Sequence, residues 1–198
     1  MPPDANVFHV TLDDIRHVLD RRRPRRVEVT ADLHEAAVAV VLVPDPQGGL
    51  RALFIKRAEY PDDPWSGQMA LPGGRRDPGD QDLLATVTRE TREETGIGLP
   101  PAALLGGLDD LSPVTAHLPR IVVRPFVFGL GTAPDLHHSP EVALHVWVPL
   151  AELSAARVTE AVHVRGQTLV MPGYRVGPHF IWGMTERIVT AFLDLIRA

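Results

Sequence analysis

The pattern of apolar and polar positions predicts four strands. Two apolar runs rich in β-branched residues, 36–43 and 51–57, are separated by the turn-forming sequence PDPQGG. Short runs bounded by proline and glycine are typical of strands that a turn joins. Two further runs of this kind, 121–130 and 142–150, lie on either side of a loop.

Three other segments carry apolar residues at helical spacing. A short helix is predicted over about 11–22, where an N-capping threonine precedes two aspartates. A second helix is predicted over about 81–95, with Asp80 as its N-cap and Gly96 as the residue that ends it. The last helix is predicted over 185–198. This order of strands and helices indicates an α/β protein built in layers, without a repeating βαβ pattern.

Composition and charge agree with one globular domain. The 198 residues are 44% hydrophobic and 23% charged, with no linker or internal repeat. We therefore expect a single domain over 1–198, with a core from about residue 35 onward. The chain has no cysteine, and no stretch approaches the roughly 20 apolar residues that cross a bilayer. We expect a cytoplasmic protein without a membrane partner.

The net charge of −5 argues against a nucleic-acid partner. Positive charge is nevertheless concentrated in the sequence RRRPRR at 21–26. We expect this basic stretch to be a solvated helix end, with contact to an anionic ligand as the alternative.

Three glutamates lie close together at the end of the second predicted helix. Glu90, Glu93 and Glu94 share a helical face and repel one another unless a cation lies among them. The helix dipole also disfavours anions at this end. Carboxylate oxygens suit Mg²⁺ or Mn²⁺, which often bind substrate phosphates as well, so the pattern predicts metal-dependent phosphate chemistry. The alternative is a solvated acidic face paired with Arg89 and Arg92.

The segment around these glutamates resembles the Nudix box. Gly74 and the later stretch 89–97, Arg-Glu-Thr-Arg-Glu-Glu-Thr-Gly-Ile, are similar to the pattern Gly…Arg-Glu-apolar-x-Glu-Glu-x-Gly-apolar. A threonine stands where an apolar residue is usual, and Arg89 comes one residue late. Either Asp80 or Asp82 takes the place of the first glutamate of the box, and thus of the partner of Arg89.

The extra residue in the box resembles the coenzyme A pyrophosphatase-like branch of this family. The upstream element of that branch, Leu-x-x-x-Arg…Gly-x-x-x-x-Pro-Gly-Gly, has its counterpart in residues 53–74. The stretches 108–115 and 181–188 are also similar to the branch, so the resemblance covers about residues 35–195.

The resemblance implies a fold and an activity. The fold is the Nudix α/β/α sandwich, a mixed β-sheet between helices with a loop-helix-loop metal site. The activity is metal-dependent attack of water on the diphosphate of coenzyme A or acyl-CoA, giving phosphopantetheine and adenosine 3′,5′-bisphosphate. The alternatives are hydrolysis of another nucleoside diphosphate derivative, such as ADP-ribose, a dinucleotide or a guanosine polyphosphate, and a non-catalytic nucleotide-sensing module. Homodimers are common in this family, but no feature of the sequence indicates one.

The resemblance also implies roles for residues of the box. Glu90, Glu94 and the carbonyl of Gly74 are expected to bind the metal. Glu93 is expected to be a further or bridging ligand, or the general base. Arg89 is expected to hold the glutamates in position.

Four residues outside the box complete the predicted site. Glu141 is a second candidate for the base, with a purely structural role as the alternative. Arg57 is expected to contact a substrate phosphate, and Gln68 is a further candidate for substrate contact. Trp65 stands close to where the branch often has a histidine, and it either stacks on an adenine or packs in the core.

Overall fold

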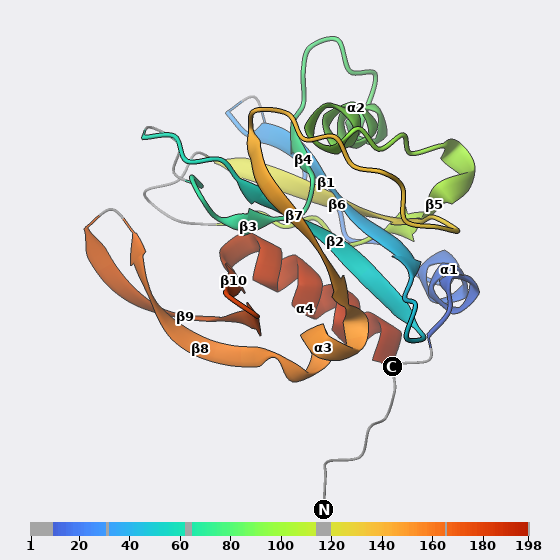
Figure 1. The fold of residues 1–198 in the computed structure, drawn as a ribbon. Coiled ribbons are helices and arrows are strands. Elements are labelled where there is room, and N and C mark those ends of the chain that lie inside the picture. The colour runs from blue at the N-terminus through green and yellow to red at the C-terminus, as the bar shows by residue number, and fades with distance from the viewer. Residues whose placement is uncertain (1–9, 31, 62–64, 114–119, 165, 198) are drawn as a thin grey trace, which may run out of the picture.

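The computed structural model describes residues 10–30, 32–61, 65–113, 120–164 and 166–197 (Figure 1). In chain order its elements are α1 (Leu12–Asp20), β1 (His34–Pro44), β2 (Leu50–Arg57), β3 (Met69–Ala70), β4 (Gly73–Arg75), α2 (Leu83–Thr95), a 3₁₀ turn (Pro101–Ala103), β5 (Leu104–Gly107), β6 (Ile121–Gly129), β7 (Val142–Pro149), α3 (Leu150–Ala155), β8 (Arg157–Val164), β9 (Gln167–Val176), β10 (His179–Trp182) and α4 (Gly183–Arg197).

A seven-stranded mixed sheet forms the centre of the molecule. Its strand order is β3-β2-β1-β6-β5, with β4 paired to β1 and β7 paired to β2. β1 and β6 are parallel, whereas β1 and β2 are antiparallel. The four strands predicted from the sequence are β1, β2, β6 and β7.

β1 and β2 diverge away from the turn that joins them. They pair next to this turn, from Pro44–Leu50 to Leu42–Ala52. Farther along, β1 pairs with β4 and β2 pairs with β3. The segment that contains β3 and β4 therefore fills the opening between the two strands. This arrangement brings the glycines of β4 into the middle of the sheet.

Helices cover both faces of this sheet (Figure 1). Val41 of β1 packs in one apolar cluster with Leu83 and Val87 of α2. The next residue along the strand, Leu42, packs in the other cluster with Phe192 of α4. Successive strand residues point to opposite faces, so one buried strand contributes to both layers. The predicted α/β/α sandwich is confirmed.

The patterns missed a second sheet of three antiparallel strands, in the order β10-β9-β8. This sheet lies on the α4 side of the molecule (Figure 1). Most residues of β8 are exposed, and Pro172 and Gly173 interrupt the apolar positions of β9. Such strands do not have the continuous apolar run by which a buried strand is recognised.

The second predicted helix begins later than expected. The side chain of Asp82 accepts a hydrogen bond from the Ala85 amide at 2.8 Å, so Asp82 is the N-cap of α2 and Asp80 is not. Gly96 ends the helix as predicted, in a left-handed conformation with φ 76°.

The basic stretch 21–26 is only in part the solvated helix end that the sequence predicts. Arg21, the C-cap of α1, and Arg23 are exposed as expected, whereas three other arginines form ion pairs. Arg22 and Arg25 pair with Asp109, and Arg26 pairs with Asp110. These ion pairs attach the segment after α1 to the loop between β5 and β6. In the part of the chain that the structure describes, no helix has both the length and the apolar content needed to span a bilayer.

Replacing Asp110 should destabilise the fold in a pH-dependent way. Its fully buried carboxylate accepts hydrogen bonds from Arg26, Arg124 and the Val27 amide. Burial raises the pKa of Asp110, but these donors more than offset that effect and hold the pKa below its ordinary value. We expect Asp110→Asn to lower the free energy of unfolding by about 2–3 kcal/mol at pH 7, measured by urea titration.

The sign of the pH dependence follows from the lowered pKa. The stabilisation is present above the unfolded-state pKa of about 3.9 and is lost as the pH falls through the folded-state value, so the variant and the wild type should converge in acid. Asp32→Asn is the matched control, because Asp32 pairs with Arg120 on the surface and should change stability by less than about 1 kcal/mol. A loss at Asp110 that persists unchanged at acid pH would contradict this account.

Thr91 offers a stabilising substitution. It is fully buried, and its hydroxyl has no hydrogen-bond partner among the described residues. Thr91→Val should raise the free energy of unfolding by about 1 kcal/mol, because it removes a buried polar group that is not satisfied. Thr86→Val is the control: Thr86 is equally buried on α2, but its hydroxyl donates to the Asp82 carbonyl at 3.2 Å. Thermal unfolding should therefore move in opposite directions for the two variants.

Candidate active site

Two glycines let α2 approach the sheet closely. Gly73 has φ 141°, and a Cβ there would lie 2.2 Å from the Ala37 carbonyl oxygen, so only glycine fits. Its N–H donates to Oε2 of Glu94 at 2.8 Å. At Gly74, a Cβ would lie 2.5 Å from the carboxyl carbon of Glu90. Both carboxylates therefore lie directly against the backbone of β4.

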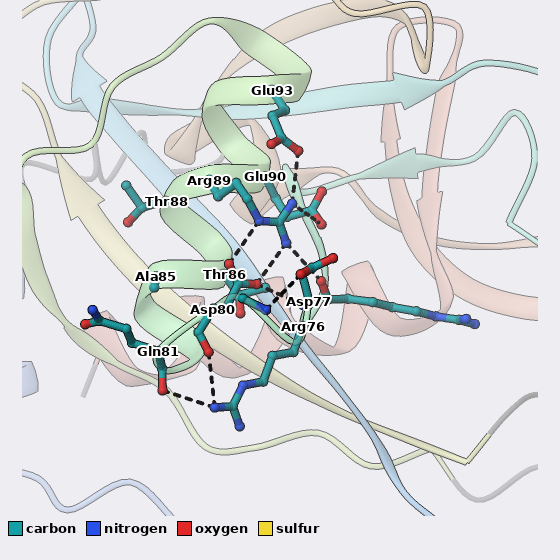
Figure 2. Close-up of polar contacts among 12 residues, drawn as sticks. Arg76, Asp77, Asp80, Gln81, Ala85, Thr86, Thr88, Arg89, Glu90 and Glu93 are labelled. Atoms are coloured by element: carbon teal, nitrogen blue, oxygen red, sulfur yellow. Dashed lines mark hydrogen bonds and ion pairs between the residues drawn. The ribbon is translucent and has the colours of Figure 1, made fainter.

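Arg89 connects the carboxylates of the helix to the preceding loop, as Figure 2 shows. Its Nε and Nη2 donate to the two oxygens of Asp80 at 3.0 and 2.9 Å. Its Nη1 lies 3.0 Å from both Glu90 Oε1 and Glu93 Oε2. Hydrogen bonding to Arg89 holds the pKa of Asp80 well below its usual range. Asp80, and not Asp82, is thus the partner of Arg89.

A cavity of about 480 Å³ lies beside these residues. It is bounded by the ends of β1 and β6, the segment 65–75, α2 and the beginning of α4. Most of the predicted site residues line it, namely Arg57, Trp65, Gln68, Gly74, Glu90, Glu94 and Glu141. Arg89 and Glu93 are not part of the lining.

The cavity concentrates negative charge. Glu94 is only 4% exposed. The pKa of Glu94 is raised to about 7: burial is the main cause, Glu90 and Glu141 add to it, and the Gly73 N–H and Arg57 act in the opposite direction. Burial likewise raises the pKa of Glu90, and Arg89 opposes this. These carboxylates need a nearby cation to stay ionised together.

The loop before β7 brings Glu141 to this cluster. The His137 amide donates to the Thr95 carbonyl at 2.9 Å, and the Ser139 amide donates to the Glu94 carbonyl at 3.2 Å. These bonds satisfy carbonyls that the C-terminal end of a helix leaves free. The carbonyl of Glu141 accepts from the Ala58 amide at 2.7 Å, which ties the loop to the end of β2.

Glu93 differs from the other two glutamates of the box. Its side chain is 58% exposed, and its carboxylate pairs with Arg89 (Figure 2). The structure therefore does not bring Glu93 into the cavity with Glu90, Glu94 and Glu141. Its expected role as a ligand or base stays a prediction.

Sequence reasoning missed the wall that α4 supplies. Met184, Thr185 and Ile188 line the same cavity as the carboxylates of the box. All three lie in the stretch 181–188, whose resemblance to the coenzyme A branch was the available signal. Periodicity alone marks this stretch only as the start of a helix.

The arrangement fits a hard divalent cation. Glu90, Glu94, Glu141 and the carbonyl of Gly74 offer only oxygen donors, which suits Mg²⁺ or Mn²⁺. Within the described residues, no three acidic or histidine side chains converge into a ready-made metal cage. Mg²⁺ commonly binds through one or two carboxylates and takes its other ligands from water and substrate phosphates. The chemistry of the donors and their excess negative charge are therefore compatible with such an ion.

The family follows from a comparison with known domains. The model of the NUDIX domain matches residues 33–167, which is more than half of the chain. The chain belongs to the Nudix family. Nudix hydrolases generally need divalent metal ions such as Mg²⁺ or Mn²⁺, and this member is an enzyme that acts on phosphoric anhydrides.

Known relatives agree with this assignment. Over 168 residues the chain is 33% identical to the mitochondrial coenzyme A diphosphatase NUDT8 of Homo sapiens, with 81% of this chain and 70% of that protein covered. It is also 33% identical over 191 residues to the uncharacterized Nudix hydrolase NudL of Enterobacter sp. strain 638, with 91% and 92% covered. The predicted resemblance to the coenzyme A pyrophosphatase-like branch is confirmed.

Solved structures support the fold. The crystal structure of a MutT/nudix family protein from Enterococcus faecalis matches with a TM-score of 0.62 at 18% identity, covering 95% of this chain and 70% of that one. The NUDIX domain of Shewanella oneidensis NrtR, crystallised with ADP ribose, matches with a TM-score of 0.52 at 22% identity, covering 70% and 85%.

Gly74→Ala should disable the site without unfolding the protein. The new methyl group would force the Glu90 carboxylate away from β4, and we expect a fall in turnover of roughly 10²-fold, as for other losses of a preorganised charged group. Gly98→Ala is the control, because a Cβ there meets nothing within 4 Å. Turnover of a nucleoside diphosphate substrate and circular dichroism would be measured for both variants. Equal activities would contradict the close approach of Gly74 and Glu90.

Proposed function

We propose that the protein hydrolyses the diphosphate of coenzyme A or acyl-CoA, with Mg²⁺ or Mn²⁺, to phosphopantetheine and adenosine 3′,5′-bisphosphate. The observation that carries this proposal is the 33% identity to a coenzyme A diphosphatase over 81% of the chain. The cavity beside the box supports it, since it combines buried carboxylates with Arg57. The substrate is thus a small nucleoside diphosphate derivative.

Glu90, Glu94 and the carbonyl of Gly74 are the proposed metal ligands. A bound divalent ion supplies a water of lowered pKa and neutralises charge on the phosphoryl oxygens. Arg89 is a positioning residue, because its ion pairs with Asp80 and Glu90 fix where α2 presents its carboxylates. Glu93 pairs with the same guanidinium and is kept as a further ligand or alternative base.

Glu141 is the proposed general base. The loop that carries it is hydrogen-bonded to both α2 and β2, and its carboxylate lies near enough to Glu90 and Glu94 to raise their pKa values. It would accept a proton from the water whose oxygen bonds to phosphorus, while the bridging P–O bond breaks and the other phosphorus leaves with its bridging oxygen as a phosphomonoester. Arg57 is proposed to contact the diphosphate. Gln68 and Trp65 are proposed to contact the rest of the substrate.

A substrate panel tests this function. The purified chain would be assayed with Mg²⁺ and with Mn²⁺ on coenzyme A, acetyl-CoA, ADP-ribose, a diadenosine polyphosphate and a guanosine polyphosphate. We expect the highest kcat/KM for coenzyme A or its acyl derivative, with phosphopantetheine and adenosine 3′,5′-bisphosphate as products. Rapid turnover of ADP-ribose or a guanosine polyphosphate with coenzyme A untouched would refute the substrate assignment.

The two neighbouring glutamates of the box should differ in importance. Glu94→Gln should lower turnover by roughly 10²-fold or more, because it removes a buried charge that the metal and the substrate need. Glu93→Gln is the matched comparison: it makes the same change at an exposed position outside the cavity, and we expect a smaller loss. Circular dichroism would check that both variants fold. Full activity in Glu94→Gln would remove Glu94 from the ligand set.

A further inference from the structure

A second cavity adjoins the candidate active site. Its volume is about 640 Å³, within the roughly 300–1,000 Å³ of typical small-molecule sites. The second sheet, with β8, β9 and β10, forms one wall, and the end of β2 with the segment 66–69 forms another. Gln68 and Met69 line both cavities, so the two meet at β3.

The second cavity is lined by cations and N–H donors. Lys56, His163, Arg175 and His179 belong to its lining, and the described residues that line it include no aspartate or glutamate. The neighbouring cavity, by contrast, holds three carboxylates. Adjoining spaces of opposite character suit a substrate with anionic groups at two separate positions, one bound through a metal and one bound directly.

Lys56 supplies the available charge, because Arg175 is already engaged. The Nε of Arg175 donates to Glu160 Oε1 at 2.8 Å, and its Nη2 pairs with the same carboxylate. The Nζ of Lys56 lies 3.8 Å from the mostly exposed carboxylate of Glu59. A surface pair of this length contributes little energy, so a phosphate can replace it at small cost.

Two aromatic rings line the same cavity, and one of them lies beside Arg175. The guanidinium carbon of Arg175 is 5.1 Å from the ring centroid of Phe180. The same ring packs against Gly173, where a Cβ would lie 2.3 Å from a ring carbon. Trp182 lines the cavity as well. Flat rings next to positive charge are the surfaces on which nucleobases stack.

We propose that this second cavity binds the phosphomonoester-bearing nucleoside end of the substrate, while the diphosphate lies beside the box. The proposal rests on the proposed function: coenzyme A carries a 3′-phosphomonoester on its adenosine, and dephospho-coenzyme A lacks this group. Lys56 pairs with the 3′-phosphate, with His163 and His179 as N–H donors. The cavity selects the substrate and takes no part in bond cleavage.

The first test compares kcat/KM for coenzyme A and dephospho-coenzyme A. The kcat/KM of the wild type should be higher for coenzyme A by roughly tenfold or more. This is the factor expected from one hydrogen bond to a charged group. Lys56→Gln should bring this ratio close to one. Arg23→Gln removes the same charge at an exposed position outside both cavities, and it should keep the wild-type ratio. A wild-type ratio near one, or a Lys56→Gln ratio equal to that of the wild type, overturns the proposal.

A binding test separates this proposal from the proposed function. Calorimetry of the metal-free protein with adenosine 3′,5′-bisphosphate and with AMP requires no turnover. The wild type should bind the bisphosphate more tightly by roughly tenfold, and Lys56→Gln should lose this preference. If coenzyme A is not hydrolysed but the preference is present, the proposed function fails and the cavity assignment stands. If coenzyme A is hydrolysed and no 3′-phosphate preference is seen in either test, the cavity assignment fails alone.

Discussion

The hydrogen bond from the Gly73 amide to Glu94 joins the central sheet to α2, and the geometry of the site depends on it. A buried carboxylate is costly unless hydrogen bonds or opposite charges compensate it. Here the amide and the nearby Arg57 compensate Glu94 in part. The bond can form because β1 and β2 diverge, which lets β4 enter the sheet with a glycine that no other residue could replace. Glu90 then lies against Gly74 for the same reason.

The C-terminal end of α2 is an unfavourable place for carboxylates, and the surrounding loops compensate for it. The helix dipole is negative at this end. Amides of His137 and Ser139 satisfy carbonyls of the last turn, and Arg89 binds Asp80, Glu90 and Glu93 from the other side. The same bonds that stabilise the helix end also bring Glu141 next to the box. Folding thus assembles more negative charge than the described cations neutralise within the cavity, which is the condition that favours a divalent ion.

The sequence could predict those strands and site residues that depend on a pattern of neighbouring residues in the chain. β1 and β2 are apolar over most of their length, because both of their faces are buried, and the spacing of Glu90 and Glu94 identifies the box. β3 and β4, with two and three residues, are too short to leave a pattern, and β8 is too exposed. The sequence prediction placed the N-cap at Asp80 instead of Asp82, because residue type does not distinguish two aspartates. Only the position of Arg89 in space distinguishes the ion-pair partner from the cap.

The segment that contains β3 and β4, which fills the opening between β1 and β2, lies next to both cavities and so connects the fold to the choice of substrate. This segment provides Gly73 and Gly74, the glycines that lie against the carboxylates of α2. Gln68 and Met69, a few residues earlier in the chain, line both cavities and form the boundary between them. The acidic cavity requires a cation before it can accept a diphosphate, whereas the cationic cavity can hold a phosphomonoester directly. A substrate with both groups would be oriented by this difference alone, because its diphosphate gains a metal contact in only one of the two spaces. On the proposed function, the second sheet therefore determines which substrate is selected. Because this sheet lies outside the box, its residues can change without altering the groups that hydrolyse the diphosphate.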